Sequence, residues 1–178
     1  MPEWRNKSLI DFESSFLHDL ACFLDSKLDQ LDSESNKAED PDAEGVYDRA
    51  EYIVGLGFAA CQQYMTTKIS YSRLNKKEAL DCGPFRNSDI PIAAIVNNVA
   101  NLWKHSAEWS KGEEERRARK LLLYLGVDHE YPDDMDICSH IATTVLHHLL
   151  SPLPNRFQML IPSLMEWRNQ ILNSIKEP

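Results

Sequence analysis

The sequence predicts an all-α fold, a single-domain bundle of about six helices that includes long antiparallel helix pairs. Long segments of the chain repeat apolar residues at helical spacing, and no segment alternates apolar and polar residues as a half-buried strand does. The chain has 178 residues, of which 43% are hydrophobic and 26% are charged. This is the composition of one ordinary globular domain, so we take 1–178 as a single domain.

The first helix is predicted to open at Ser8, with Asp11 three residues on as a shortened capping box. Residues 1–7 before it and residues 176–178 at the other end are expected to be flexible tails. An acidic loop without an apolar period, residues 33–45, ends this helix. The apolar residues of the helix are Leu9, Phe12, Phe16, Leu20, Phe23, Leu24, Leu28 and Leu31.

A second helix is predicted over residues 46–70, and its middle contains Gly55 and Gly57. Each glycine inside a helix costs about 1 kcal/mol relative to alanine, so something has to compensate for the pair. A neighbouring helix that packs closely, or a ligand that approaches the backbone, would do so. Close helix packing is the interpretation that we favour.

The second half of the chain is divided by proline and glycine. Gly83 and Pro84 break the chain within 75–88, and Gly126 is a typical helix end. Pro162 is expected to kink or restart the last helix. The predicted helices are residues 89–110, 113–125, 132–150 and 155–175.

Charge and cysteine content exclude several classes of function. Lys and Arg total 19 against 28 Asp and Glu, so the net charge of −9 draws the chain neither to nucleic acid nor to anionic lipid. The four cysteines form no CxxC pair, and no segment has the length of a membrane span, which predicts a cytoplasmic protein with no membrane partner. No GxSxG, GxxxxGK or GxGxxG motif occurs, and we expect no cofactor.

The predicted third helix carries an unusual polar face. Asn98, Asn101, His105 and Glu108 are spaced i, i+3, i+7 and i+10, which places them on one side of a helix. Asparagine is a poor helix former, and such conflicts with local propensity concentrate at functional sites. His105 could act as a general acid or base, with Lys104 stabilising a phosphoryl charge. The alternatives are a solvated face or a buried amide network that fixes helix register.

The segment Ala100-Asn101-Leu102-Trp103-Lys104-His105, with Glu108-Trp109 after it, resembles a short signature of small uncharacterised bacterial helical proteins. It also loosely resembles HEPN domains, which are helical bundles with an Arg-(four to six residues)-His motif. The resemblance covers about residues 92–109 and implies metal-independent RNA cleavage or, where the motif is incomplete, a binding or antitoxin-like role. No arginine precedes His105 at that spacing, and Asn98 stands where it could have been. Of the residues in the HEPN motif, only the histidine has a counterpart in this sequence, and it is His105.

A second constellation consists of Asp136, His140 and His147, with His129 or Glu130 nearby. On one helix, Asp136 and His140 would be one turn apart and His147 two turns further, so a metal site is conceivable. The spacing lacks the HxxxH or HExxH pattern that places two imidazoles on adjacent turns. Surface histidines that flank a core stripe are the interpretation that we favour.

One dense basic cluster follows the third helix, and phosphate contact is its functional interpretation. Glu113 and Glu115 lie four residues before Arg117 and Arg119, so a solvated helix with internal ion pairs is the competing one. The cluster consists of Lys111, Arg116, Arg117, Arg119 and Lys120.

These observations lead to a first hypothesis and two rivals. The first is a cytosolic bacterial interaction module, of a defence or toxin–antitoxin system, that binds a protein partner or a second copy of itself as a homodimer. The second is a HEPN-like ribonuclease that uses His105 with Asn98, Asn101, Lys104 and Glu108, in which case RNA is the partner. The third is a metal-binding helical protein.

Overall fold

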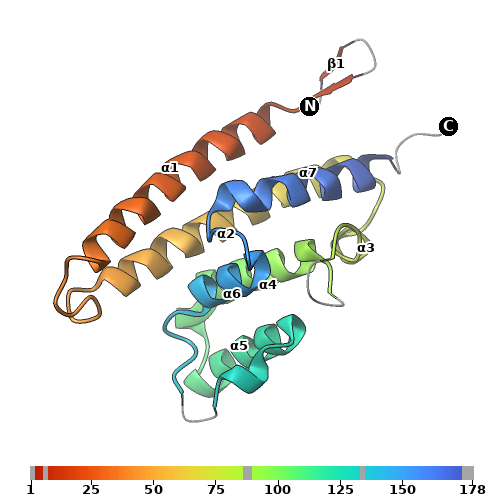
Figure 1. Cartoon of the computed structure of the whole chain (residues 1–178). Helices are drawn as coiled ribbons and strands as arrows, with labels where there is room; N and C mark the ends of the chain where they lie inside the picture. Colours follow the sequence, from red (N-terminus) through yellow and green to blue (C-terminus); the bar gives the residue numbers. More distant parts are fainter. Residues whose placement is uncertain (1–2, 6–7, 86–89, 133–134, 174–178) are drawn as a thin grey trace.

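A computed structural model of the chain describes residues 3–5, 8–85, 90–132 and 135–173. Over these residues the predicted all-α bundle is confirmed (Figure 1). Two long helices, α1 and α2, form an antiparallel pair, and α2 also packs against α4, α6 and α7. The helices are α1 (Phe12–Ser35), α2 (Val46–Tyr71), α3 (Lys76–Leu80), α4 (Ile92–His105), α5 (Lys111–Leu125), α6 (Ile141–Leu150) and α7 (Phe157–Asn173).

The core lies around α2, whose two predicted glycines are explained by close packing. A Cβ atom built on Gly55 would lie 2.1 Å from the indole of Trp103 in α4, and one built on Gly57 would lie 2.2 Å from the ring of Phe157 in α7. A larger residue at Gly55 would therefore push α4 away from α2, and a larger residue at Gly57 would push α7 away from it. Helix α1 lies at one edge of the bundle, whereas α5 lies at the opposite end and packs against α4 and α6 (Figure 1).

The start of the chain differs from the prediction. A small antiparallel hairpin of β1 (Glu3–Arg5) and β2 (Ser8–Ile10) pairs Trp4 with Leu9, so part of the predicted tail 1–7 has regular structure. Ser8 belongs to β2 and does not open a helix. Asp11 is the N-cap of α1 instead, and its side chain accepts a hydrogen bond from the backbone N–H of Ser14 at 3.1 Å. Residues 1–2, 6–7 and 176–178 lie outside the described part.

Several helix bounds also differ. Helix α4 begins at Ile92, after Pro91, and ends at His105, where a 3-10 turn (Ser106–Glu108) follows. Ser110 caps α5, which begins at Lys111, two residues earlier than predicted. Helix α7 continues through Pro162 without restarting, and the short α3 occupies part of the predicted break.

The predicted helix 132–150 starts too early, because residues 135–140 are not helical and α6 begins at Ile141. The first turn of α6 is capped by a side chain of another helix. The buried carboxylate of Glu51 in α2 accepts hydrogen bonds from the backbone nitrogens of Ala142 and Thr143, both at 2.8 Å. The Thr143 hydroxyl donates to the same carboxylate at 2.6 Å.

In the described part of the chain, no helix is long and apolar enough to span a bilayer.

Candidate functional site

The polar face of α4 divides into two parts, and the first is a buried amide network with α2. Gln62 Nε2 donates to Asn97 Oδ1 at 3.0 Å and to Asn101 Oδ1 at 2.8 Å. Lys104 Nζ donates to the other end of the same amide, Gln62 Oε1. Asn97 and Gln62 are both buried. This geometry matches the predicted alternative of an amide network that fixes the register of one helix against another.

The second part is an exposed cluster at the end of α4. His105 Nδ1 lies 2.9 Å from Glu108 Oε1, and the imidazole lies against the indole of Trp109, with ring centroids 6.2 Å apart. The guanidinium of Arg117 stacks on the same indole at 4.3 Å. The His105 side chain is 42% exposed. A carboxylate that orients one imidazole nitrogen leaves the other nitrogen available for proton transfer.

The predicted face is therefore brought together only in part. Asn101 and Lys104 meet at Gln62, whereas His105 and Glu108 meet at Trp109. The half-buried Asn98 makes no side-chain hydrogen bond with any of these residues, all of which the structure describes. Asn97, which is not among the residues of the predicted polar face, is 7% exposed and faces α2.

Helix α5 carries the predicted basic cluster, and its cations have different surroundings. Glu113 accepts from Arg116 Nε at 2.9 Å and from Arg117 Nε at 2.8 Å, and these hydrogen bonds, that of Arg116 first, lower the pKa of Glu113 to about 2. Arg119 donates to the backbone oxygens of Tyr131 and Pro132, both at 3.1 Å. Lys111, at the start of the helix, is exposed.

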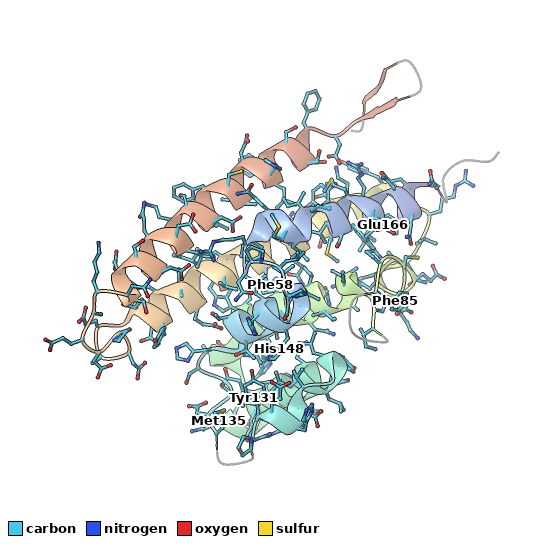
Figure 2. The ribbon with its side chains drawn as sticks, in the orientation of Figure 1. Phe58, Phe85, Tyr131, Met135, His148 and Glu166 are labelled. Atoms are coloured by element: carbon cyan, nitrogen blue, oxygen red, sulfur yellow. The ribbon has the colours of Figure 1, made fainter. Side chains whose placement is uncertain are left out.

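Three of the predicted cations line one pocket of about 540 Å³ at the surface of α5. The segment after α5 forms the opposite wall, and Figure 2 labels Tyr131 there. Arg117 is not part of the lining. The lining residues are Arg116, Arg119, Lys120, Leu123, Asp128, His129, Tyr131 and Pro132.

The candidate metal ligands have separate partners. Asp136 accepts from the Cys138 backbone N–H and the Ser139 hydroxyl, both at 3.1 Å. His140 Nε2 lies 3.6 Å from Asp48, and His147 Nδ1 lies 3.1 Å from Asn155. Among the residues that the structure describes, no group of three or more His, Cys, Asp and Glu side chains is arranged to hold a metal ion.

The outer face of α1 is a feature that the pattern did not reveal. We predicted Phe12, Phe16 and Phe23 as part of one apolar stripe, but they are 70%, 71% and 57% exposed. The predicted Leu24, Leu28 and Leu31 are buried, and they share the buried stripe with Leu17 and Ala21, which the pattern did not include. Two apolar stripes side by side are more than one buried face requires, and this width was the signal in the sequence.

The sequence did not reveal Gln62 of α2 as the partner of Asn97, because the two residues lie 35 positions apart and no local pattern links them. It also did not reveal that Arg117 of α5 stacks on Trp109.

No protein-family model, no curated protein and no solved structure matches the chain, so the chemistry of these surfaces is argued from their own residues.

Proposed function

We propose that the protein is an interaction module that docks through the outer face of α1, and that the occupant of this face is a second copy of the chain. The observation that supports this most is the exposure of Phe12, Phe16 and Phe23 on one side of a 24-residue helix at the edge of the bundle (Figure 1). Contiguous exposed apolar patches mark interaction surfaces on folded proteins. We call Phe12, Phe16, Leu20 and Phe23 the α1 stripe.

The spacing of the α1 stripe suits a two-fold contact. A symmetric dimer requires a patch that is complementary to itself, so that each contact occurs twice. If two α1 helices pair antiparallel about a point near residue 18, Phe12 faces Phe23 of the second copy and Phe16 faces Leu20. The contact then has Phe–Leu pairs at its centre and Phe–Phe pairs at its two ends, each occurring twice.

The buried area would be sufficient for a specific dimer. A phenylalanine contributes roughly 150 to 250 Å² when buried, so the three exposed rings supply on the order of 400 Å² per copy. A stable interface buries about 800 Å² per partner, and the flanking side chains of a helix pair of this length can supply the rest. The three rings would then form the apolar centre of the contact.

Charge sets the conditions of the contact. Each copy carries a net charge of −9, so two copies repel each other at long range. Glu13 is held by Lys68 of its own chain, and the Lys27 ammonium lies 5.6 Å from the Phe23 ring, so the stripe itself is not flanked by acidic charge alone. Because salt screens the repulsion but strengthens apolar burial, we expect dimerisation to tighten as salt is raised.

Sedimentation equilibrium over a range of protein concentrations and at two salt concentrations tests the proposal. We expect a monomer–dimer equilibrium that Phe16→Asp weakens at least tenfold. Phe85→Asp is the matched control, because Phe85 is 59% exposed but lies away from α1 (Figure 2). A wild-type chain that is monomeric at all concentrations, or a Phe16→Asp variant that dimerises as the wild type does, would contradict the proposal.

A second candidate function is supported by the contact between His105 and Glu108. The resemblance of residues 92–109 to HEPN domains suggests RNA cleavage in a cytoplasmic bacterial defence or toxin–antitoxin system. His105 Nε2 would take the proton from a ribose 2′-hydroxyl as that oxygen attacks the adjacent phosphorus, and the bond from phosphorus to the 5′-oxygen of the next nucleotide would break, with the leaving oxygen protonated by water. Glu108 would orient the imidazole through Nδ1. Arg117, held near this cluster by Trp109, could stabilise a phosphoryl charge.

Incubation of the protein with structured RNAs in the presence of a chelator tests this candidate. We expect cleavage by the wild type and by His147→Ala, whose imidazole is exposed elsewhere on the surface, but not by His105→Ala. If none of the three proteins cleaves the RNA, or if His105→Ala cleaves it as the wild type does, the candidate is ruled out. Circular dichroism of each variant confirms that it is folded.

A further inference from the structure

We propose that the pocket beside α5 binds a nucleoside phosphate, either free or as part of an RNA strand. The proposal does not depend on the α1 stripe, which shares no residue with this pocket. Its volume of about 540 Å³ lies in the range of small-ligand sites. Its lining combines positive charge with an exposed apolar wall, and a phosphate joined to a flat ring is complementary to both.

The positive charge of the pocket contrasts with the rest of the chain. Arg116, Arg119 and Lys120 line it together with the carboxylate of Asp128, in a protein whose net charge is −9. Glu113 and Glu115, outside the lining, pair with Arg116 and Arg119, so Lys120 carries the charge that is least compensated. Cations gathered in a concave surface concentrate anions there despite an acidic whole. The pocket is therefore the place where a phosphate would be attracted to this chain.

The three cations would have different roles. Arg116 uses Nε and Nη2 for Glu113, which leaves Nη1 to face a ligand. The Lys120 ammonium lies 5.4 Å from the Tyr124 ring and is exposed to solvent, so it retains donors for a phosphate. Lys120 and Arg116 are the groups that would contact the phosphate.

Arg119 is a positioning residue. Its guanidinium donates to the backbone oxygens of Tyr131 and Pro132, and thereby ties the opposite wall of the pocket to α5. It would act through the shape of the pocket, because these hydrogen bonds direct two of its nitrogens away from a ligand.

The apolar wall is the second observation that points to a ligand. Leu123 is 60% exposed, and it lines the pocket together with Tyr131 and Pro132. Tyr131 is held in place by its hydroxyl, which lies 2.8 Å from His148 Nε2. Figure 2 labels both residues. A nucleobase packed on this wall would cover Leu123 and could stack on Tyr131.

Calorimetric titration with ADP, AMP and inorganic phosphate, and anisotropy with a labelled single-stranded RNA, test the proposal on the wild type and four variants. Lys111→Gln is the matched control for Arg116→Gln and Lys120→Gln, because Lys111 is an exposed cation of the same helix outside the pocket. We expect Lys120→Gln to weaken binding at least tenfold, Arg116→Gln several-fold, and Lys111→Gln less than twofold. Leu123→Glu, a change at an exposed position, should abolish binding while the helical circular dichroism signal persists.

The two sources of the nucleoside phosphate are distinguished by the titrations. Saturable binding of ADP or AMP, lost in Lys120→Gln, supports a free nucleotide, whereas the same losses seen with RNA alone support a nucleotide within a strand. Inorganic phosphate should bind at least tenfold more weakly than either. The proposal is overturned if no probe binds saturably, if Lys111→Gln weakens binding as much as Lys120→Gln, or if phosphate alone binds as tightly as ADP.

Discussion

Asp25 in α1 caps the first turn of α7 at Phe157, a residue 132 positions later in the chain. Its buried carboxylate accepts from the Phe157 backbone N–H at 2.7 Å and from that of Gln158 at 3.0 Å. Glu51 in α2 does the same for α6 at Ala142. The long α1–α2 hairpin thus supplies the N-terminal caps of two later helices, and these hydrogen bonds tie α6 and α7 to it.

Replacing Asp25 by Ala should destabilise the fold by about 2 kcal/mol, since it removes a helix cap and leaves two backbone donors unpaired in the interior. Asp29→Ala, four residues later, removes an exposed ion pair with Arg156 and should cost less than about 1 kcal/mol. Urea unfolding followed by circular dichroism measures both. Equal costs would contradict the capping role of Asp25.

These caps explain which parts of the fold were predictable. The second predicted helix, residues 46–70, agrees with α2 because its apolar period lies within the segment itself. The predicted start at Pro132 was wrong for α6, because the group that caps it comes from Glu51, 91 residues earlier. The five residues of α3 and the three-residue strands are too short to show a period.

Glycine substitutions should separate close packing from helix propensity. Gly55→Ala and Gly57→Ala each place a methyl group against a ring, Trp103 or Phe157, and should destabilise the fold by about 1 to 3 kcal/mol. Gly112 lies in α5 with nothing near its Cβ direction, so Gly112→Ala should stabilise by about 0.5 to 1 kcal/mol. Thermal unfolding gives the sign of each effect, and a stabilising Gly55→Ala would refute the packing explanation.

Two buried carboxylates should give opposite pH dependences, and Asp11 is the first. Burial raises its pKa, but hydrogen bonds from Lys68, Arg168 and Tyr64 together outweigh burial and lower the pKa below its usual value. The stability that Asp11 contributes is therefore present above its unfolded-state pKa and is lost as pH falls through its folded-state pKa. Asp11→Asn should cost about 3 kcal/mol at pH 7, because Lys68 loses a buried partner 2.6 Å away, and the cost should shrink toward pH 3.

Glu51 should behave in the opposite way. Burial raises its pKa, and the hydrogen bonds from Thr143 and Ala142 reverse this only in part. A raised folded-state pKa means that its contribution is fully present below the unfolded-state pKa and is lost as pH rises through the folded-state pKa. The free energy of unfolding of the wild type, relative to that of Glu51→Gln, should therefore increase as pH falls. Urea unfolding at a series of pH values measures this difference, and a shift in the same direction as that of Asp11→Asn would contradict the assignment.

Gln62 should be the central residue of the amide network. Gln62→Leu leaves Asn97, Asn101 and Lys104 without their shared partner and should destabilise the fold by about 1 to 3 kcal/mol. Gln63→Leu is the neighbouring control, since Gln63 is exposed, and should have an effect within about 0.5 kcal/mol. Chemical unfolding compares the two variants, and similar costs would show that the network does not stabilise the α2–α4 contact.

The candidate site was predictable only where its residues are close in sequence. His105 and Glu108 are three residues apart and do meet, as helical spacing predicts. The pairing of Asn101 and Lys104 with Gln62 depends on how α2 packs on α4, which no local pattern contains. The exposure of Phe16 likewise depends on which of two apolar stripes of α1 faces the bundle.

The most direct test of the proposed α1 contact is a photo-crosslink from within the α1 stripe. A benzoylphenylalanine in place of Phe16 keeps an aromatic side chain at the centre of the stripe. After irradiation, we expect a cross-linked dimer whose joined peptides map to residues near Leu20 of the second copy, as the antiparallel register requires. Crosslinks that map to another surface of the chain, or the absence of a cross-linked dimer at concentrations where the protein self-associates, would contradict the account.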